Sequence, residues 1–169
     1  MQNLFIEGDN LDGLYYLRKE YLNKIKMIYI DPPYNTGKRQ SYNDKRTYDA
    51  WKSFMYPRLY LGRDLLRGDG FIFISIDDNM LSSLRSMCDE IFGLSNFMCV
   101  CPRVTKKGGK LTKNIDKNND YIVIYRKTDA ANLIHAVLPP EYFNLEDEFL
   151  KTRGRFSLSR TIDCCAFDS

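Results

Sequence analysis

Histidine is almost absent from this sequence of 169 residues, which contains only His135. No cysteine or carboxylate stands beside it at the spacing of a metal ligand or a catalytic base. This absence disfavours serine and cysteine hydrolases that use histidine as their base. The Gly-x-x-x-x-Gly-Lys-Ser/Thr pattern that cradles nucleotide phosphates is also missing, which argues against a nucleotidase.

A cysteine pattern typical of disulfides or of a zinc site is missing too. The chain has five cysteines, an odd number, and none of them belongs to a Cys-x-x-Cys pair. Since there is neither a disulfide framework nor a zinc pattern, we interpret them as buried free thiols and predict no metal site. Cys99 and Cys101 are two residues apart, a spacing that in a strand places both on one face. The full set is Cys88, Cys99, Cys101, Cys164 and Cys165.

Long apolar runs are also lacking. The longest uncharged ones, such as residues 71–76, fall far short of the ~20 residues that a membrane helix needs, and the N-terminus lacks the basic-then-apolar order of a signal peptide. We therefore expect a soluble, cytoplasmic protein without membrane contact. Hydrophobic residues nevertheless make up 44% of the chain, which is enough for the core of one domain and excludes wholesale disorder.

The sequence shows an alternation of strand and helix patterns. Runs rich in β-branched and aromatic residues predict strands, and apolar residues at 3.6-residue spacing, such as Leu84, Met87, Cys88 and Ile91, predict helices. The expected strands are 4–6, 27–30, 71–76, 96–101 and 121–125; the expected helices are 11–21, 51–67 and one that Asp77 or Asp78 caps and that ends at Phe92. This order predicts an α/β domain with a mainly parallel sheet, in which the last two strands are an antiparallel addition.

Two polar stretches interrupt this pattern. Residues 35–49 form a loop that is too long for a mere connection, so it is a candidate functional loop. Residues 102–128 carry a net charge of +6, in a chain whose total is +3. A basic loop with glycines suits phosphate contacts on a nucleic acid, and a solvated hairpin loop remains an equally open interpretation. The candidate contacts are Arg103, Lys106, Lys107 and Lys110.

The Asp31-Pro32-Pro33-Tyr34 motif directly follows the second expected strand, where ligands gather in open α/β sheets. An aromatic amine, such as the exocyclic nitrogen of adenine, is a poor nucleophile because its lone pair is delocalised into the ring. If the Asp31 carboxylate and the Pro32 carbonyl accept its two hydrogens, the lone pair is localised and free to attack an electrophile. Tyr34 offers a ring on which a flipped-out base can stack. An ordinary rigid turn is the alternative, and we accept that alternative for Pro139-Pro140.

The sequence resembles the DNA adenine-N6 methyltransferases of the permuted type, in particular the modification subunits of type III restriction-modification systems. Segments that look like that family occur in the same order along nearly the whole chain: 3–10, 28–37, 55–59, 70–79, 119–127 and 151–155. The resemblance implies a Rossmann-like, S-adenosylmethionine-dependent methyltransferase fold, with a mostly parallel sheet, an antiparallel hairpin at one edge, and an incomplete set of strands in this chain.

The same resemblance implies roles for individual residues. Asp31, Pro32, Pro33 and Tyr34 would form the catalytic motif, and S-adenosylmethionine would be the methyl donor. Asp9, Asn10 and Asp31 would bind that donor, although Asp9 could equally cap the following helix. Ser75 and Asp77 would lie near the catalytic loop, at the end of the next strand.

One departure from the family limits this interpretation. The aromatic-x-Gly-x-Gly donor loop and the target-recognition region, which lie towards the C-terminus in this family, do not occur here, and the strands missing from the sheet would lie between 4–6 and 27–30, leaving an unpaired edge. We therefore expect residues 1–128 to be the catalytic part of a methyltransferase domain and 129–169 an irregular segment.

The resulting hypothesis is a truncated, site-specific DNA methyltransferase that methylates adenine N6 in a restriction-modification system. Its partners would be DNA, a second methyltransferase subunit and a restriction subunit. An amino-methyltransferase acting on RNA or cytosine is one alternative, although cytosine enzymes usually begin the motif with Ser. A noncatalytic remnant that binds nucleic acid or a partner subunit is the other, and binding of the donor separates it from an enzyme.

Overall fold

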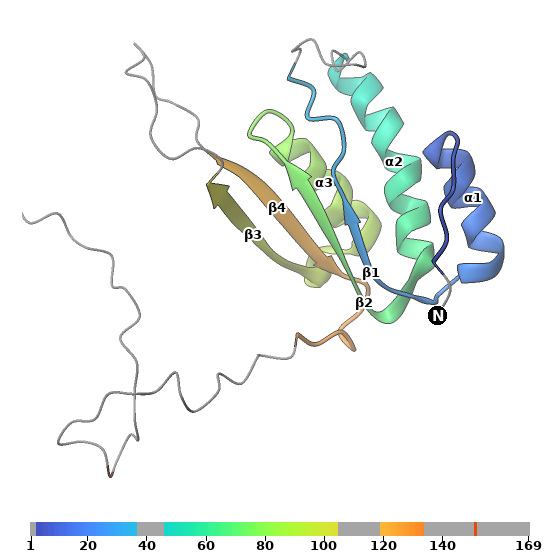
Figure 1. The fold of residues 1–169 in the computed structure, drawn as a ribbon. Coiled ribbons are helices and arrows are strands. Elements are labelled where there is room, and N and C mark those ends of the chain that lie inside the picture. The colour runs from blue at the N-terminus through green and yellow to red at the C-terminus, as the bar shows by residue number, and fades with distance from the viewer. Residues whose placement is uncertain (1–2, 37–45, 105–118, 134–150, 152–169) are drawn as a thin grey trace, which may run out of the picture. The chain divides into compact units, whose positions relative to one another are not determined.

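The computed structural model describes residues 3–36, 46–104, 119–133 and 151, and Figure 1 shows their arrangement. Contacts along the chain divide it into two units, Met1–Asn132 and Leu133–Ser169; nearly all of the second unit lies outside the described residues. The elements are α1 (Asn10–Tyr21), β1 (Ile25–Ile30), α2 (Tyr48–Leu65), β2 (Leu66–Ile76), α3 (Leu81–Phe92), the 3-10 turn η1 (Leu94–Asn96), β3 (Phe97–Val104) and β4 (Asn119–Arg126).

The described strands form one mixed sheet in the order β1-β2-β4-β3. β1 and β2 are parallel, whereas β4 is antiparallel to both β2 and β3. The α/β class and the antiparallel hairpin at one edge, both predicted from the sequence, are thereby confirmed. The sheet of the described strands is mixed rather than mainly parallel, because one strand pair is parallel and two are antiparallel. Because β1 and β2 run in the same direction, their carboxyl ends meet at one edge of the sheet, and the Asp31–Tyr34 motif begins there.

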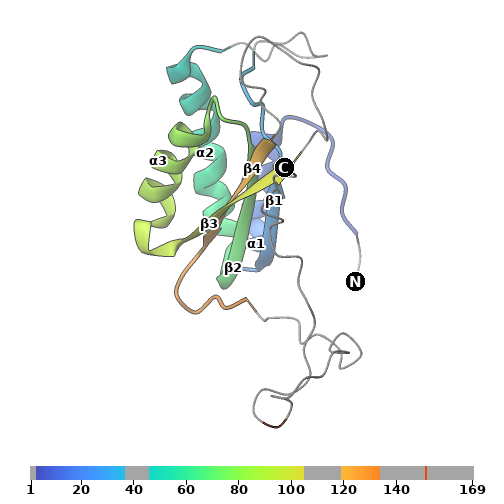
Figure 2. The same cartoon turned by 90° about the vertical axis from the view of Figure 1, so that its left-hand side faces the viewer.

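The hydrophobic core lies between one face of this sheet and two helices. Figure 2 shows α2 and α3 on the same side of the strands. Trp51, Met55 and Leu59 of α2 pack there with the isoleucines of β2. The predicted apolar stripe of α3 is confirmed, because Leu84, Met87, Cys88 and Ile91 are all buried. The stripe thus fixes which face of α3 meets the sheet.

The cysteines are less uniformly buried than the sequence predicts. Cys88 is a buried free thiol, as expected, but Cys99 is only half-buried and Cys101 is exposed. The reason is their place on β3, which is an edge strand of the described sheet. Cys164 and Cys165 lie outside the described residues.

The predicted strand at 4–6 is wrong. Residues 3–7 have no regular structure, and Leu4, Phe5 and Ile6 are 57%, 89% and 40% exposed. A strand needs a neighbour to complete its hydrogen-bond ladder, and no described strand pairs with this segment. Within the described residues β1 is therefore an edge of the sheet.

The start of β2 also differs from the prediction. The strand begins at Leu66 rather than Phe71, because Ile25 pairs with Leu66 while Met27 pairs with Phe71, so that residues 67–70 bulge from the ladder. Gly70 suits this bulge, since a Cβ there would lie 3.0 Å from the Arg67 carbonyl oxygen and 3.1 Å from that of Ile25.

Neither Asp77 nor Asp78 caps α3. The residue at the cap is Met80, which makes no capping hydrogen bond from its side chain. The Asp77 carboxylate instead accepts hydrogen bonds from the backbone and side-chain nitrogens of Asn79, at 3.0 and 2.7 Å. The Asp77 carboxylate is thus already used in a local turn before the helix begins, which is why the capping prediction failed.

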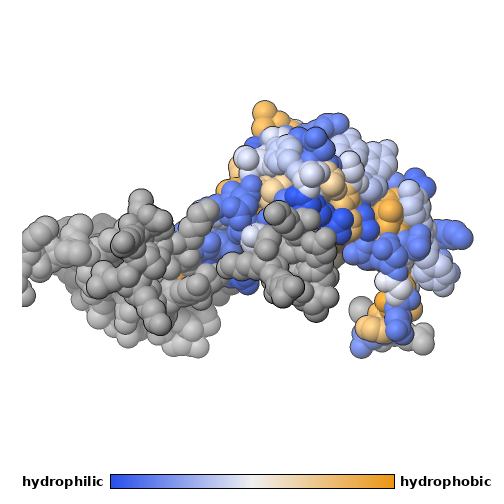
Figure 3. Space-filling model, turned by 90° about the horizontal axis from the view of Figure 1, so that it is seen from above, coloured by the Kyte–Doolittle hydropathy of each residue, from blue (hydrophilic) through white to orange (hydrophobic). Residues whose placement is uncertain are grey.

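Seen from above, the described surface is mainly hydrophilic, with hydrophobic side chains in separate patches (Figure 3). None of the helices in the described part of the chain is long and apolar enough to span a membrane.

Candidate active site

The Asp31–Tyr34 motif is held where β1 leaves the sheet. The Trp51 indole N–H donates a hydrogen bond to the Pro33 carbonyl oxygen at 2.7 Å, and Trp51 is fully buried in α2. Asn35, whose φ of 59° lies in the left-handed region, accepts from the Arg46 backbone N–H at 2.7 Å through its side chain. Trp51 of the core therefore fixes the backbone of the motif at Pro33. Asn35, which follows the motif, connects it to the residues just before α2.

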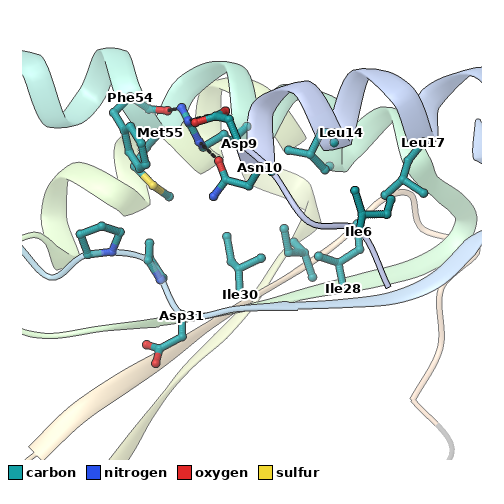
Figure 4. A pocket seen from close by; sticks show the side chains of 17 residues that line it. Ile6, Asp9, Asn10, Leu14, Leu17, Ile28, Ile30, Asp31, Phe54 and Met55 are labelled. Carbon is teal, nitrogen blue, oxygen red and sulfur yellow. Dashed lines mark hydrogen bonds and ion pairs between the residues drawn. The ribbon is translucent and has the colours of Figure 1, made fainter. Parts of the chain in front are cut away.

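The side chains of β1 divide the site into two sides. Ile28 and Ile30 point towards α2, whereas the Asp31 carboxylate points to the opposite face of the strand (Figure 4). This follows from the alternation of side chains along a strand, which also puts Tyr29 on the face of Asp31. An apolar pocket lies on the first side and a polar cluster on the second.

The polar cluster consists of Tyr29, Asp31, Tyr34 and Ser75. The Tyr29 hydroxyl lies 2.5 Å from Ser75 Oγ. Burial, together with a hydrogen bond to the Asp31 carboxylate and its negative charge, raises the pKa of Tyr34 to about 12, while a hydrogen bond with Ser75 acts in the opposite direction. Tyr34 therefore stays protonated at neutral pH and donates its hydroxyl hydrogen to Asp31.

The pocket lies between α1, β1, α2 and the segment before α1. Its volume is about 430 Å³, within the range of small-molecule sites. Most of its walls are apolar. Asp9 and Asn10 form a polar side of the pocket (Figure 4), and Arg58 also lines it. The apolar lining includes Ile6, Leu14, Leu17, Ile28, Ile30, Phe54 and Met55. An apolar cavity with a few polar groups at one side suits a ligand that has both characters.

Asp9 both caps α1 and lines the pocket. Its Oδ1 accepts a hydrogen bond from the Leu11 backbone N–H at 2.8 Å, so the capping alternative is confirmed. The carboxylate is 61% exposed, which leaves acceptor capacity on the pocket side.

Arg58 is a pocket residue that sequence reasoning did not single out. Its Nε donates to Asn10 Oδ1 at 2.8 Å, its Nη1 donates to the Phe54 carbonyl oxygen at 2.6 Å, and its Nη2 lies 3.6 Å from Asp9 Oδ1. The guanidinium also stacks 3.6 Å from the centre of the Phe54 ring. Burial lowers the pKa of Arg58, against the pull of Asp9. One side chain of α2 thus sets the position of Asn10.

Arg103 makes a paired contact with Asp120. Its Nε and Nη2 donate to the two carboxylate oxygens at 2.8 and 2.5 Å, across the antiparallel pair β3–β4. The pairing lowers the pKa of Asp120 and raises that of Arg103, to which the Tyr34 and Tyr29 hydroxyls also contribute. The role of Arg103 in nucleic-acid binding stays a prediction. Lys106, Lys107 and Lys110 lie outside the described residues.

Ser75 lies beside the motif, as the resemblance implied, because its hydroxyl bonds Tyr34. Tyr29 was not singled out, although strand alternation would have placed it beside Asp31. Asp120 and Arg58 had no such signal, because their partners are distant in sequence. In the part of the chain that the structure describes, no group of three or more His, Cys, Asp or Glu side chains is placed to hold a metal ion.

The sequence matches known proteins along most of its length. The family model N6_N4_Mtase, described as DNA methylase, matches residues 25–157. The chain is 40% identical to the Mod subunit of the type III restriction-modification enzyme StyLTI from Salmonella typhimurium, over 83% of this chain and 26% of that protein. It is also 40% identical to the EcoPI Mod subunit of Escherichia phage P1, over 78% of this chain and 26% of that protein. The chain thus spans about a quarter of the length of these curated relatives.

Solved structures share the fold at lower identity. The Thermus thermophilus protein TTHA0409, complexed with S-adenosyl-L-methionine, matches with a TM-score of 0.58 and 16% identity, over 89% of this chain and 66% of that one. The cytosine-N4-specific PvuII DNA methyltransferase matches with a TM-score of 0.52 and 14% identity, over 85% and 59%. At these identities the likeness concerns the α/β fold alone.

Proposed function

Since the chain belongs to the N6_N4_Mtase family of DNA methylases, we propose that it transfers a methyl group from S-adenosylmethionine to the N6 amino group of adenine in DNA. One observation carries this proposal above the others. The Asp31–Tyr34 motif stands between an apolar pocket on one side of β1 and a polar cluster on the other. A donor and an acceptor of the methyl group can approach such a motif from its two sides.

The Asp31 carboxylate is the acceptor for the target amine in this proposal. At rest it accepts the Tyr34 hydroxyl hydrogen, and an arriving amine takes over this hydrogen bond. With one N–H directed to Asp31 and the second to the Pro32 carbonyl oxygen, the nitrogen lone pair is held out of the ring. The Tyr34 hydroxyl keeps its contact with Ser75, so its ring remains in place for the base to stack on.

The pocket suits S-adenosylmethionine. Asp9 and Asn10 supply oxygen acceptors for the polar groups of the cofactor, Arg58 holds Asn10 in position, and the isoleucines of β1 contact its apolar parts. When bound, the cofactor supplies an electrophilic methyl group on a positively charged sulfur. The side chain of Asp31 points away from this pocket (Figure 4), so its share in holding the cofactor would come from its backbone.

Adenine is the proposed target because the motif begins with Asp31. In enzymes that methylate the cytosine N4 amine, the first residue is usually Ser, as the family resemblance implies. A carboxylate is a stronger hydrogen-bond acceptor than a hydroxyl, so it forms a stronger hydrogen bond with the amine N–H.

We also propose that DNA is bound in part through the basic residues Arg103, Lys106, Lys107 and Lys110. The names of the relatives, Mod subunits of type III restriction-modification enzymes, support a role in such a system with a restriction subunit as partner. A second methyltransferase subunit is a further partner in this proposal. A cytoplasmic location fits an odd number of cysteines without a disulfide framework.

Two measurements on the purified chain test the proposal. The first is calorimetric titration with S-adenosylmethionine, for which we expect micromolar binding that Asn10→Ala weakens and Asp31→Asn leaves nearly unchanged. The second is incubation with S-adenosylmethionine and duplex DNA, followed by mass spectrometry of the nucleosides. We expect N6-methyladenine, and we expect Asp31→Asn to abolish it.

The matched control for Asp31→Asn is Asp129→Asn, an exposed carboxylate outside the pocket lining. A folded chain that binds the cofactor but methylates no base would overturn the proposed catalysis and favour a noncatalytic role. The appearance of N4-methylcytosine instead would overturn the choice of adenine.

A further inference from the structure

Two thiols face each other on β3, on the same face of the sheet as Tyr29 and Ser75 and separated from β2 by β4. Cys99 and Cys101 are both free, and their Sγ atoms lie 3.5 Å apart. Residues two apart on a strand share a face. Their partners on β4 are Ile124 and Ile122, so the two sulfurs lie on an apolar surface.

Both thiols can be reached from outside. Cys101 is exposed and Cys99 is half-buried, in contrast to Cys88, which belongs to the core. β3 is also the edge strand of the described sheet, so among the described residues nothing pairs with its outer side. The pair is therefore available to a ligand without unfolding of the core.

A direct disulfide between the two residues is disfavoured by the geometry of a strand. Residues two apart on an extended strand have Cα atoms roughly 6.7 Å apart, near the upper limit of about 6.8 Å for disulfides. Closing the S–S bond would bend the strand, whereas an ion that bridges the two sulfurs needs no such change.

We propose that Cys99 and Cys101 form a binding site for one thiophilic monovalent metal ion of the copper(I) type, held between two thiolates. Soft thiolate ligands select such ions. A structural zinc ion needs four ligands, and no third His, Cys, Asp or Glu joins the pair within the described residues. A two-coordinate ion requires only what the pair supplies.

Binding exchanges protons for metal. Each thiol loses its proton to the solvent, two S–metal bonds form, and the oxidation states do not change. Burial and the neighbouring thiol raise the pKa of Cys99. Because the thiolate is the ligand, affinity should increase as the pH rises.

The test is an anaerobic competition titration of the folded chain with copper(I) and a chromophoric chelator. The parent protein for this test carries Cys164→Ser and Cys165→Ser, so that these two neighbouring thiols cannot bind the ion. We expect one ion per chain and the release of protons. Cys99→Ser and Cys101→Ser should each weaken binding by roughly a hundredfold or more, because the second ligand is lost from a chelate.

Cys88→Ala is the matched control and should leave the affinity unchanged, since Cys88 is buried in the core. If the folded parent binds no copper(I), or if either serine variant binds as tightly as the parent, the proposed site is overturned. Circular dichroism of each variant verifies that a loss of binding is not a loss of fold.

Discussion

The Tyr29 hydroxyl lies 2.5 Å from Ser75 Oγ, although 46 residues separate the two in sequence. The bond joins β1, which carries the Asp31–Tyr34 motif, to β2 beside it. Ser75 is 1% exposed, and it also contacts the Tyr34 hydroxyl. One small buried hydroxyl therefore holds both tyrosines of the polar cluster.

Ser75→Ala should destabilise the fold by about 1 kcal/mol, because it removes the partner of two tyrosine hydroxyls. Urea denaturation of the two proteins would measure the difference. Ser86→Ala is the control, since its hydroxyl bonds only the Ser82 carbonyl on an exposed part of α3, and it should stay within roughly 0.5 kcal/mol of the wild type. Equal stability of the Ser75→Ala variant and the wild type would contradict this prediction.

Tyr34 should titrate at about pH 12 in the folded protein. Asp31→Asn should lower this pKa towards 10, because it removes the carboxylate charge and its acceptor strength. NMR of ring-labelled tyrosine would measure the shift, with Tyr34→Phe to identify the signal. A Tyr34 pKa that does not fall in the Asp31→Asn variant would argue against the hydrogen bond between these residues.

The same pKa predicts a dependence of stability on pH. The folded value of Tyr34 lies above its unfolded value of about 10, so between these values the unfolded chain holds fewer protons and stability falls as pH rises. Tyr34→Phe should reduce this loss. The measurement is the denaturation midpoint of the wild type and of Tyr34→Phe at about pH 9 and about pH 11, on either side of the unfolded pKa. The midpoint should fall more in the wild type. An equal fall in both proteins would exclude a contribution from Tyr34.

Arg58→Lys should weaken the binding of S-adenosylmethionine. A lysine keeps the charge but cannot bond Asn10 and the Phe54 carbonyl oxygen together, nor stack on the Phe54 ring as a guanidinium does. Calorimetry would report a higher Kd, whereas Lys52→Ala, a change on the same helix outside the pocket lining, should have no effect. Unchanged affinity in Arg58→Lys would mean that Asn10 does not depend on Arg58.

Arg103→Ala should destabilise the fold at neutral pH, since it leaves the nearly buried Asp120 carboxylate without its partner. The pKa of Asp120 is lowered in the fold, so the contribution of the pair is complete above about pH 4 and is lost as pH falls through the folded pKa. The difference between variant and wild type should therefore shrink in acid. Adding Asp120→Asn should recover part of the stability, and a double variant no better than Arg103→Ala would contradict this account.

The basic loop should contribute more to DNA binding than Arg103 does. Replacing Lys106, Lys107 and Lys110 by Ala should reduce the dependence of log affinity on log salt by about 0.9 for each phosphate contact that is lost. Arg103→Ala should change this slope less, because Asp120 already holds the guanidinium. Fluorescence anisotropy with labelled duplex DNA at several salt concentrations measures both, and a larger slope change for Arg103→Ala would reverse the ranking.

The elements that could be predicted from the sequence are those whose pattern is local. The stripe of α3 and the apolar run of β2 carry their own periodicity, and the Asp31–Tyr34 motif is a contiguous signal. The strand at 4–6 failed because a strand also depends on a neighbour elsewhere in the chain. For the same reason the contact of Arg58 with Asn10, 48 residues away, and the pairing of Arg103 with Asp120 were invisible before the fold was known.

The bond from Trp51 to the Pro33 carbonyl gives the protein an internal optical reporter. The chain contains a single tryptophan, it is fully buried, and its indole N–H is bonded to the motif at the proposed centre of the chemistry. A ligand that shifts the backbone at Pro33 changes the surroundings of that indole, so its ultraviolet emission follows occupancy of the site without any added label.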